Sequence, residues 1–269
     1  MTWTIPPVSE IAPDGTAYDL IGPEGAPCVV LIHGLGLSRK LWEAHLPAFA
    51  GYRVLLYDLY GHGESAPPPE AASLPVFAAQ LDALMAHVGI AQGHIVGFSI
   101  GGMINRRFAL DYPTRVASLV ILNSPHDRGE EAQALVEARA KSVREQGAFS
   151  TFDAALKRWF TSEYLASNDG ADLVRDWRGQ VDAESYAQTA WVLAHGVREL
   201  IAPVPPLDVR AMVMTCENDS GSTPAMSEGI AAEITGAELR IVPALQHLGL
   251  MEQPEAFTTP ILDFLRKVS

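Results

Sequence analysis

The chain has 269 residues, with 19 Lys plus Arg against 32 Asp plus Glu, and its formal net charge is -13. This balance argues against a nucleic-acid partner and against an anionic membrane, because both need a basic protein surface. With 48% hydrophobic and 19% charged residues the chain can bury a sizeable core, which excludes the composition typical of disordered proteins.

Short apolar runs bounded by Gly or Pro alternate with longer segments of helical periodicity. The pattern predicts an α/β fold in βαβα order throughout, with a mostly parallel, twisted sheet and helices on both of its faces. The predicted strands are Ala17–Ile21, Cys28–Ile32, Val54–Asp58, His94–Val96, Val116–Leu122, Ala211–Cys216 and Glu238–Val242. The predicted helices beside them are Leu74–Val88, Ile100–Leu110, Pro224–Ile234 and Pro254–Val268.

The alternation is interrupted once, between Ser124 and about Pro206, where no strand is predicted. The helical stretches in this region are Glu130–Gln146, Phe152–Leu165, Leu173–Gln180 and Ser185–Leu200. An all-helical insertion in an α/β pattern indicates a separate cap laid over the sheet. We therefore predict a helical cap at 124–206, inserted after the strand 116–122, and an α/β core formed by 1–123 and 207–269.

The two cysteines, Cys28 and Cys216, each fall in a predicted strand, which excludes a disulfide framework and indicates buried thiols in a reducing compartment. The first 15 residues carry neither a basic region nor a signal-length apolar stretch, and Pro6 and Pro7 would break a helix there. No apolar run approaches the roughly 20 residues that span a bilayer. We expect a cytoplasmic protein without a membrane partner, and its oligomeric state is left open.

The motif Gly97-Phe98-Ser99-Ile100-Gly101 lies between a predicted strand and a predicted helix. In a nucleophile elbow of this form the serine occupies a strained turn, and the small residues around it let neighbouring backbone pack closely. The turn places the serine hydroxyl at the carboxyl edge of the sheet and at a helix N-terminus, where free amides favour a developing negative charge. Ser99 is therefore the predicted nucleophile.

A second motif, His33-Gly34-Leu35-Gly36, directly follows the strand 28–32. A glycine-rich turn at this place frees backbone amides. We predict that the amides of Leu35 and Ile100 form an oxyanion hole, and that His33 braces the loop and does not transfer protons.

A serine hydroxyl needs a base to become a nucleophile, and the base needs an orienting acid. His247 lies in a short loop between the last predicted strand and the last helix, which fits the order Ser, acid, His along the chain. Asp219 follows the strand 211–216 and is the predicted acid. Glu217, two residues earlier, and Asp127, after the strand 116–122, stay open as alternatives.

Together these motifs resemble the α/β-hydrolase superfamily over nearly the whole chain. The resemblance also rests on DLYGHGES at 58–65, YPTRV at 112–116 and Glu252-Gln253-Pro254 after His247. It implies the α/β-hydrolase fold. The serine at position 99 is similar to the esterase and lactonase branches, whereas haloalkane dehalogenases and epoxide hydrolases of this fold carry Asp there.

The segment Lys157–Thr161 and the tail Glu252–Phe257 resemble 3-oxoadipate enol-lactonases. The chain departs from that family at Gly34, where serine is common, and at Tyr60, where many superfamily members have Arg. The resemblance implies that Trp159 lines the pocket, with a core aromatic as the alternative. It also makes Arg158 and Arg128 candidates to bind a substrate carboxylate, with solvated surface arginines as the alternative.

The predicted function is hydrolysis of a small carboxylic ester or lactone through a covalent acyl-serine. No metal or organic cofactor is expected, because the Cys and His residues show no ligand spacing such as C-x-x-C. Two alternatives stay open. One is carbon-carbon, thioester or amide hydrolysis on the same triad, and the other is a small-molecule sensor of the same fold.

Overall fold

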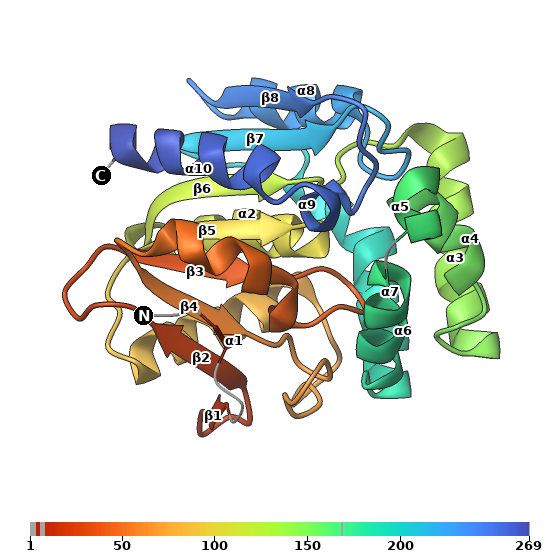
Figure 1. Ribbon diagram of the computed structural model, residues 1–269, viewed down its shortest axis with the longest axis horizontal. Coiled ribbons are helices and arrows are strands. Elements are labelled where there is room, and N and C mark those ends of the chain that lie inside the picture. The colour runs from red at the N-terminus through yellow and green to blue at the C-terminus, as the bar shows by residue number, and fades with distance from the viewer. Residues whose placement is uncertain (1–3, 6–8, 168, 269) are drawn as a thin grey trace.

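The computed structural model describes residues 4–5, 9–167 and 169–268, which form one eight-stranded sheet with helices around it (Figure 1). The strands are β1 (Glu10–Ile11), β2 (Ala17–Ile21), β3 (Cys28–Ile32), β4 (Arg53–Tyr57), β5 (Gly93–Phe98), β6 (Val116–Leu122), β7 (Ala211–Cys216) and β8 (Glu238–Val242). Pro6 and Pro7, which we expect to break any N-terminal helix, lie outside the described residues.

Every predicted strand is present, and the order across the sheet is β1-β2-β4-β3-β5-β6-β7-β8. Neighbours from β4 to β8 are parallel, whereas β1, β2 and β4 pair antiparallel. The predicted βαβα order is therefore wrong at the N-terminal end. Only the short segment 22–27 joins β2 to β3, and a crossover between parallel strands needs about a dozen residues. The additional strand β1 has two exposed residues, too few to give an apolar pattern.

The strands in the middle of the sheet are buried on both faces. All five residues of β3 are buried. Val29 and Leu31 pack into the hydrophobic cluster on one side of the sheet, and Val30 and Ile32 pack into the cluster on the other side. This two-sided burial explains the continuous apolar run at 28–32, as expected for a parallel sheet covered by helices.

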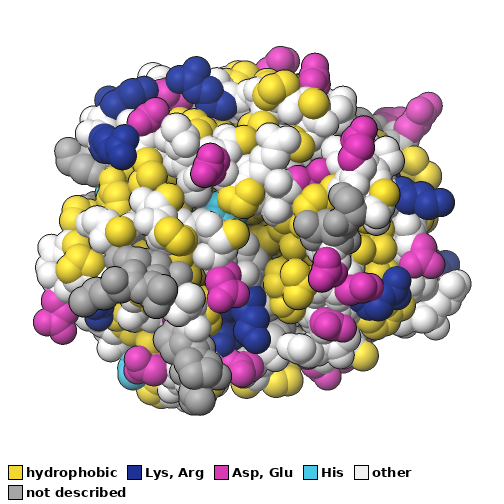
Figure 2. Space-filling model, viewed as in Figure 1, with side chains coloured by type: hydrophobic (Ala, Val, Ile, Leu, Met, Phe, Trp, Pro, Cys, Tyr) yellow, Lys and Arg dark blue, Asp and Glu magenta, His cyan; other side chains and the backbone are white. Residues whose placement is uncertain are grey.

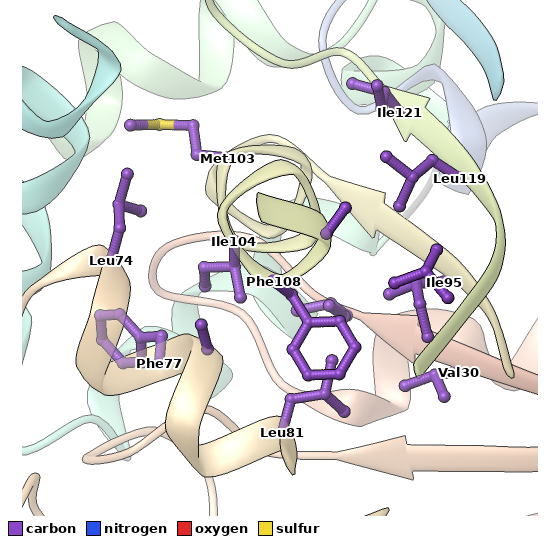
Figure 3. Packing of buried hydrophobic residues seen from close by; sticks show 14 of the residues in the cluster. Val30, Leu74, Phe77, Leu81, Ile95, Met103, Ile104, Phe108, Leu119 and Ile121 are labelled. Carbon is purple, nitrogen blue, oxygen red and sulfur yellow. The ribbon is translucent and has the colours of Figure 1, made fainter. Parts of the chain in front are cut away.

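One face of the sheet is covered by α1 (Leu74–His87), α2 (Ile100–Asp111) and α8 (Pro224–Glu233). In Figure 3, Phe77 of α1 and Phe108 of α2 lie in the same cluster as Ile95 of β5. All three side chains are fully buried. Helix α2 is thus held firmly against the sheet, which fixes the position of the turn that precedes it.

The other face is covered by η1 (Arg39–Phe49), a 3-10 helix, and by α10 (Glu255–Val268). The predicted elements do not include η1, which contains Pro47 and has the tighter turn of a 3-10 helix. Two short helices complete the core, η2 (Pro113–Arg115) and α9 (Gly249–Glu252).

Residues 124–206, called the helical insertion below, contain no strand in their described part. Their helices are α3 (Gly129–Gln146), α4 (Phe152–Trp159), α5 (Ser162–Ser167), α6 (Gly170–Gly179), α7 (Ala183–His195) and η3 (Gly196–Leu200). In Figure 1, α3 to α7 stand beside the edge of the sheet toward which the arrowheads of β3 and β5 point. The predicted helix 152–165 is interrupted because the backbone of Phe160 is extended, with φ -123° and ψ 150°.

In the described part of the chain, no helix combines the length and the apolar character that crossing a membrane requires. On the face shown in Figure 2, acidic side chains are spread over the surface, and Lys and Arg side chains occur in small groups. The described residues of this face therefore form no broad basic patch of the kind that nucleic-acid binding needs.

Candidate active site

Ser99 occupies the turn between β5 and α2, with φ 57° and ψ -116°. Such a backbone conformation is rare for a residue with a side chain and costs on the order of 1–3 kcal/mol, so it persists only where the surroundings enforce it. The amide of Ser99 donates a hydrogen bond of 2.8 Å to the carbonyl of Leu122, at the end of β6. This bond holds the turn against the neighbouring strand.

Two glycines of the motif are required by close packing around this turn. A Cβ at Gly97 would lie 2.1 Å from the carbonyl oxygen of Gly101, and a Cβ at Gly101 would lie 2.6 Å from the carbonyl oxygen of Ile32. Both obstacles are backbone atoms, so no side-chain rotation could relieve the clash. The glycines let α2 start directly against β5 and β3.

His247, in the loop after β8, connects Ser99 to Asp219. Its Nε2 lies 3.2 Å from Ser99 Oγ, and its Nδ1 lies 2.6 Å from Asp219 Oδ2. With the ring proton on Nδ1, the imidazole donates to the carboxylate and accepts from the serine hydroxyl. This arrangement can transfer the serine proton to Nε2 while the carboxylate stabilises the resulting charge.

Asp219 lies in the loop after β7, is only 2% exposed, and accepts hydrogen bonds on both oxygens. Oδ1 accepts from the amides of Gly221 and Ser222 at 2.8 and 2.9 Å, and Oδ2 accepts from Nδ2 of Asn123 at 2.9 Å. Burial raises the pKa of Asp219, but His247 and these hydrogen bonds lower it more, so the pKa lies below its ordinary value of 3.8. The carboxyl group is therefore ionised at neutral pH.

The two alternative acids are engaged elsewhere. Asp127 is exposed and accepts a hydrogen bond of 2.9 Å from the amide of Gly129, at the start of α3. Glu217 is also exposed and accepts from the amide of Ala244 at 2.9 Å. The structure thus brings Asp219, and neither alternative, to the ring of His247.

The turn after β3 forms part of the wall around Ser99. Leu37 donates its amide to the carbonyl of Gly34 at 3.2 Å, and Leu35 lines the same pocket as Ser99. Ile100 is the first residue of α2, where amides have no acceptor within the helix. Of the two residues predicted to form the oxyanion hole, Leu35 therefore lies on the wall of this pocket and Ile100 directly follows Ser99.

His33 braces this turn, as the sequence predicts. With its proton on Nδ1, the ring donates to the carbonyl of Gly34 at 2.8 Å, and its Nε2 accepts from the amide of Leu59 at 3.0 Å. Burial lowers the pKa of His33 to about 4, so the ring is neutral at pH 7. At Gly34 a Cβ would lie 3.0 Å from the ring of Phe98, which leaves little room for the serine that is common in the resembled family.

A cavity of about 170 Å³ opens beside Ser99 and His247, between the sheet edge and the helical insertion. Trp159, Arg158 and Arg128 all line it, and the ring centroid of Trp159 lies 6.4 Å from that of His247. Nε of Arg158 donates to the carbonyl of Ala154, within the same helix, at 3.2 Å. Arg128 donates to the side chain of Gln133 and to the carbonyl of Leu193. A role of these residues in substrate binding stays a prediction.

Three further polar residues at the site were not among the predicted ones. Asn123 follows β6 with φ 46° and orients Asp219, and an Asn directly after a buried strand is a sequence signal for such a position. Arg139 and Arg178 line the cavity. The sequence contains no signal that separates them from solvated arginines, because helical periodicity does not indicate which polar residues face a cavity.

The loop that carries His247 is joined to the helical insertion by hydrogen bonds. The amide of Leu248 donates to the carbonyl of Trp159 at 2.8 Å. Glu252 accepts from the amide of Thr161 at 2.9 Å and from its hydroxyl at 2.5 Å. These bonds fall at the interruption between α4 and α5, and they connect the general-base candidate to the wall above it.

Among the described residues, no three His, Cys, Asp or Glu side chains are grouped as metal ligands would be. Cys28 and Cys216 are free and buried, as the sequence indicates.

Comparisons with known proteins give the same architecture. Residues 27–254 match a family model described as alpha/beta hydrolase fold. The chain is 28% identical over 244 residues to 3-oxoadipate enol-lactonase 2 of Acinetobacter baylyi, with 89% of each chain covered.

Two solved structures show how far the likeness extends. A crystal structure of an enol-lactonase from Burkholderia xenovorans has a TM-score of 0.83 and 27% identity, covering 93% of this chain and 96% of that one. A thermophilic esterase from Thermogutta terrifontis, solved with malate bound, has a TM-score of 0.80 and 27% identity, covering 94% and 93%. With the fold and more than half of the sequence matched, the chain belongs to the α/β-hydrolase fold family.

Proposed function

We propose that the protein is a serine hydrolase that cleaves a small carboxylic ester or lactone through a covalent acyl-serine. The observation that carries this proposal is the continuous series of hydrogen bonds from Ser99 to His247 to Asp219 at the wall of a cavity. We further propose that the helical insertion, residues 124–206, acts as a cap over a core formed by 1–123 and 207–269.

In the first half of the reaction, Ser99 Oγ attacks the carbonyl carbon of the substrate while Nε2 of His247 removes the hydroxyl proton. The amides of Leu35 and Ile100 stabilise the negative oxygen of the tetrahedral intermediate. Asp219 stabilises the imidazolium and holds its tautomer. The imidazolium then protonates the leaving oxygen, and the acyl group stays on the serine.

In the second half, His247 removes a proton from a water molecule that attacks the acyl carbon. Collapse of the second tetrahedral intermediate releases the acid and returns the proton to Ser99. No step needs a group outside the chain other than substrate and water.

An enol-lactone is the favoured substrate class within this proposal. Support comes from the relatives named enol-lactonases and from the size and composition of the cavity. A cavity of about 170 Å³, with Trp159 and Leu35 on its walls, suits a small acyl group. A cytoplasmic location stays a prediction.

The test is turnover of short-chain nitrophenyl esters and simple lactones, followed by a screen of enol-lactone, thioester and amide substrates with product identification. Sustained release over many turnovers is the expected result. An alkyl phosphonate should label Ser99, as read by peptide mass spectrometry. One burst per chain without further turnover would instead favour a sensor, and the absence of both turnover and label would overturn the proposal.

A further inference from the structure

Arg178, on α6 of the helical insertion, is a buried cation on the wall of the cavity. Its side chain is only 2% exposed, and its guanidinium carbon lies 4.7, 5.0 and 5.1 Å from the ring centroids of Phe152, Trp159 and Tyr186. It also lies beside the turn after β3, because a Cβ at Gly36 would be 3.1 Å from Arg178 Nε. Three aromatic rings thus hold this guanidinium near the proposed oxyanion hole.

The polar contacts of Arg178 are few for a buried charge. Nη1 donates to the carbonyl of Ala148 at 3.3 Å, and Nε has no hydrogen-bond partner among the described residues. Arg39, another buried arginine, lies in ion pairs with Asp19, Asp58 and Glu64. A buried charge without a carboxylate partner is costly, and cation–π contacts offset only part of that cost. An anion in the cavity would complete its environment.

Three other arginines line the same cavity from α3, α4 and the segment before α3. Arg128, Arg139 and Arg158 have no ion pair with any described residue. Burial lowers the pKa of Arg128 to about 10, and the nearby Arg139 contributes. Burial also lowers the pKa of Arg139, to which Arg158 contributes. All three arginines line the same cavity as Arg178.

Arginines of the helical insertion that lie outside the cavity are paired differently. Arg144 pairs with Glu184, Arg175 with Asp153, and Arg198 with Glu137. Among the described residues that line the cavity, the single carboxylate is Asp219, which is already engaged by His247. In a chain of net charge -13, four arginines around one cavity thus lack the partners that their neighbours have.

We propose that the cavity binds a substrate with two anionic groups, one carboxylate on Arg178 and a second on the group formed by Arg128, Arg139 and Arg158. This inference rests on the proposed function, since it takes the cavity as the substrate site. A neutral ester would leave both positive regions without a partner. A substrate with one carboxylate would satisfy only one of them.

Binding can be measured without chemistry in the Ser99→Ala protein by calorimetry. The probes are dicarboxylates from succinate to pimelate, together with the monomethyl and dimethyl esters of the chain length that binds best. Each carboxylate replaced by a methyl ester should weaken binding about tenfold or more, the range of a charge-assisted hydrogen bond. Equal affinity of the diacid and its monomethyl ester would overturn the two-anion proposal. Equal affinity of the monomethyl and dimethyl esters would overturn it too.

Variants in the same background assign the two positions. With Arg178→Met, the diacid and its monomethyl ester should bind equally, because one carboxylate has lost its partner. Arg178→Lys keeps the charge and should retain part of the difference in affinity between the diacid and its monomethyl ester. This variant keeps the test informative if the methionine variant folds poorly. The double variant Arg139→Met and Arg158→Met should remove the preference for the second carboxylate. Arg144→Met, on α3 but outside the cavity, is the matched control and should change affinity less than twofold.

These measurements separate the two proposals. If neutral esters are turned over by the parent protein but dicarboxylates show no preference, the hydrolase proposal stands and the two-anion proposal is wrong. If dicarboxylates bind as expected but no ester is turned over, the anion site stands and the hydrolase proposal is wrong.

Discussion

The carboxyl edge of the sheet and the helical insertion meet at one cavity, but they place their residues in different ways. Ser99 and Asp219 follow the ends of the buried strands β5 and β7, and His247 follows the partly exposed edge strand β8. These strands are parallel, and the register of the sheet brings their ends to one edge. The cavity arginines lie on α3, α4 and α6 and just before α3, and α3 and α4 each have an exposed face. Topology therefore places the proposed reacting groups, whereas the proposed substrate contacts depend on long side chains of the insertion.

Removing the proposed nucleophile should have the largest effect on activity, and it tests the role of the sheet edge. Ser99→Ala should reduce ester turnover by a factor on the order of 10⁴ or more, because a triad acts as a unit. The melting temperature should stay within a few degrees, since the substitution removes one hydroxyl and adds no atom. Calorimetric binding of ligands to the insertion side should persist. Parent-like turnover in this variant would contradict the assignment of the reacting groups to the sheet edge.

The orienting acid is the next test of the sheet edge. Asp219→Asn should reduce kcat by roughly 10³ to 10⁴, because an amide stabilises the wrong imidazole tautomer. Asp127→Asn is the matched control at the start of the helical insertion and should leave kcat nearly unchanged. The reverse ranking would move the acid from the loop after β7 to the loop after β6.

The buried histidines of the core predict how stability depends on pH. Burial lowers the pKa of His33 and His45 to about 4 and that of His62 to about 3, below the ordinary value of 6.5. Between pH 6.5 and 4 the unfolded chain binds protons that the folded chain does not, so the free energy of unfolding should fall as the pH is lowered. Each histidine contributes at most about 1.4 kcal/mol per pH unit.

Urea denaturation at several pH values would measure this slope. His45→Gln should flatten it, and His87→Gln, at an exposed position of α1, should leave it unchanged. A free energy of unfolding that is constant or rises as the pH falls through this range would contradict the expected protonation states.

The smallest expected effect concerns the contact between the two regions. The two carboxylate oxygens of Glu252 accept one hydrogen bond each from Thr161, and the side chain of Glu252→Gln has only one oxygen that can accept. The substitution should therefore lower the free energy of unfolding by about 1 kcal/mol. Because Trp159 and His247 flank this contact, KM should rise severalfold while kcat changes less. Glu255→Gln, exposed at the start of α10, is the control. Unchanged KM and stability in Glu252→Gln would show that the insertion is held in place without it.

The sequence predicts the sheet edge much better than the insertion. Continuous apolar runs reveal buried strands, and the motif around Ser99 has glycines because backbone atoms leave no room for a Cβ. The position of Asp219 follows once its strand is known. By contrast, η1 contains Pro47, which argues against a helix in the sequence, and the break at Phe160 depends on contacts with a segment about 90 residues later. The sequence does not indicate Arg178 as an anion-binding residue, because its burial depends on packing among helices that are distant in the chain.

Gly36 limits which helical insertions can be combined with this core in a chimaera. With φ 71° and a missing Cβ that would lie 2.8 Å from the ring of Tyr186, this residue lets α7 and α6 approach the turn after β3 closely. A chimaera that received a foreign insertion would have to preserve that approach, and an insertion accepted here could fail in a relative with a bulkier residue at this turn. The turn that carries the proposed oxyanion loop and the insertion that contacts it must therefore match in shape.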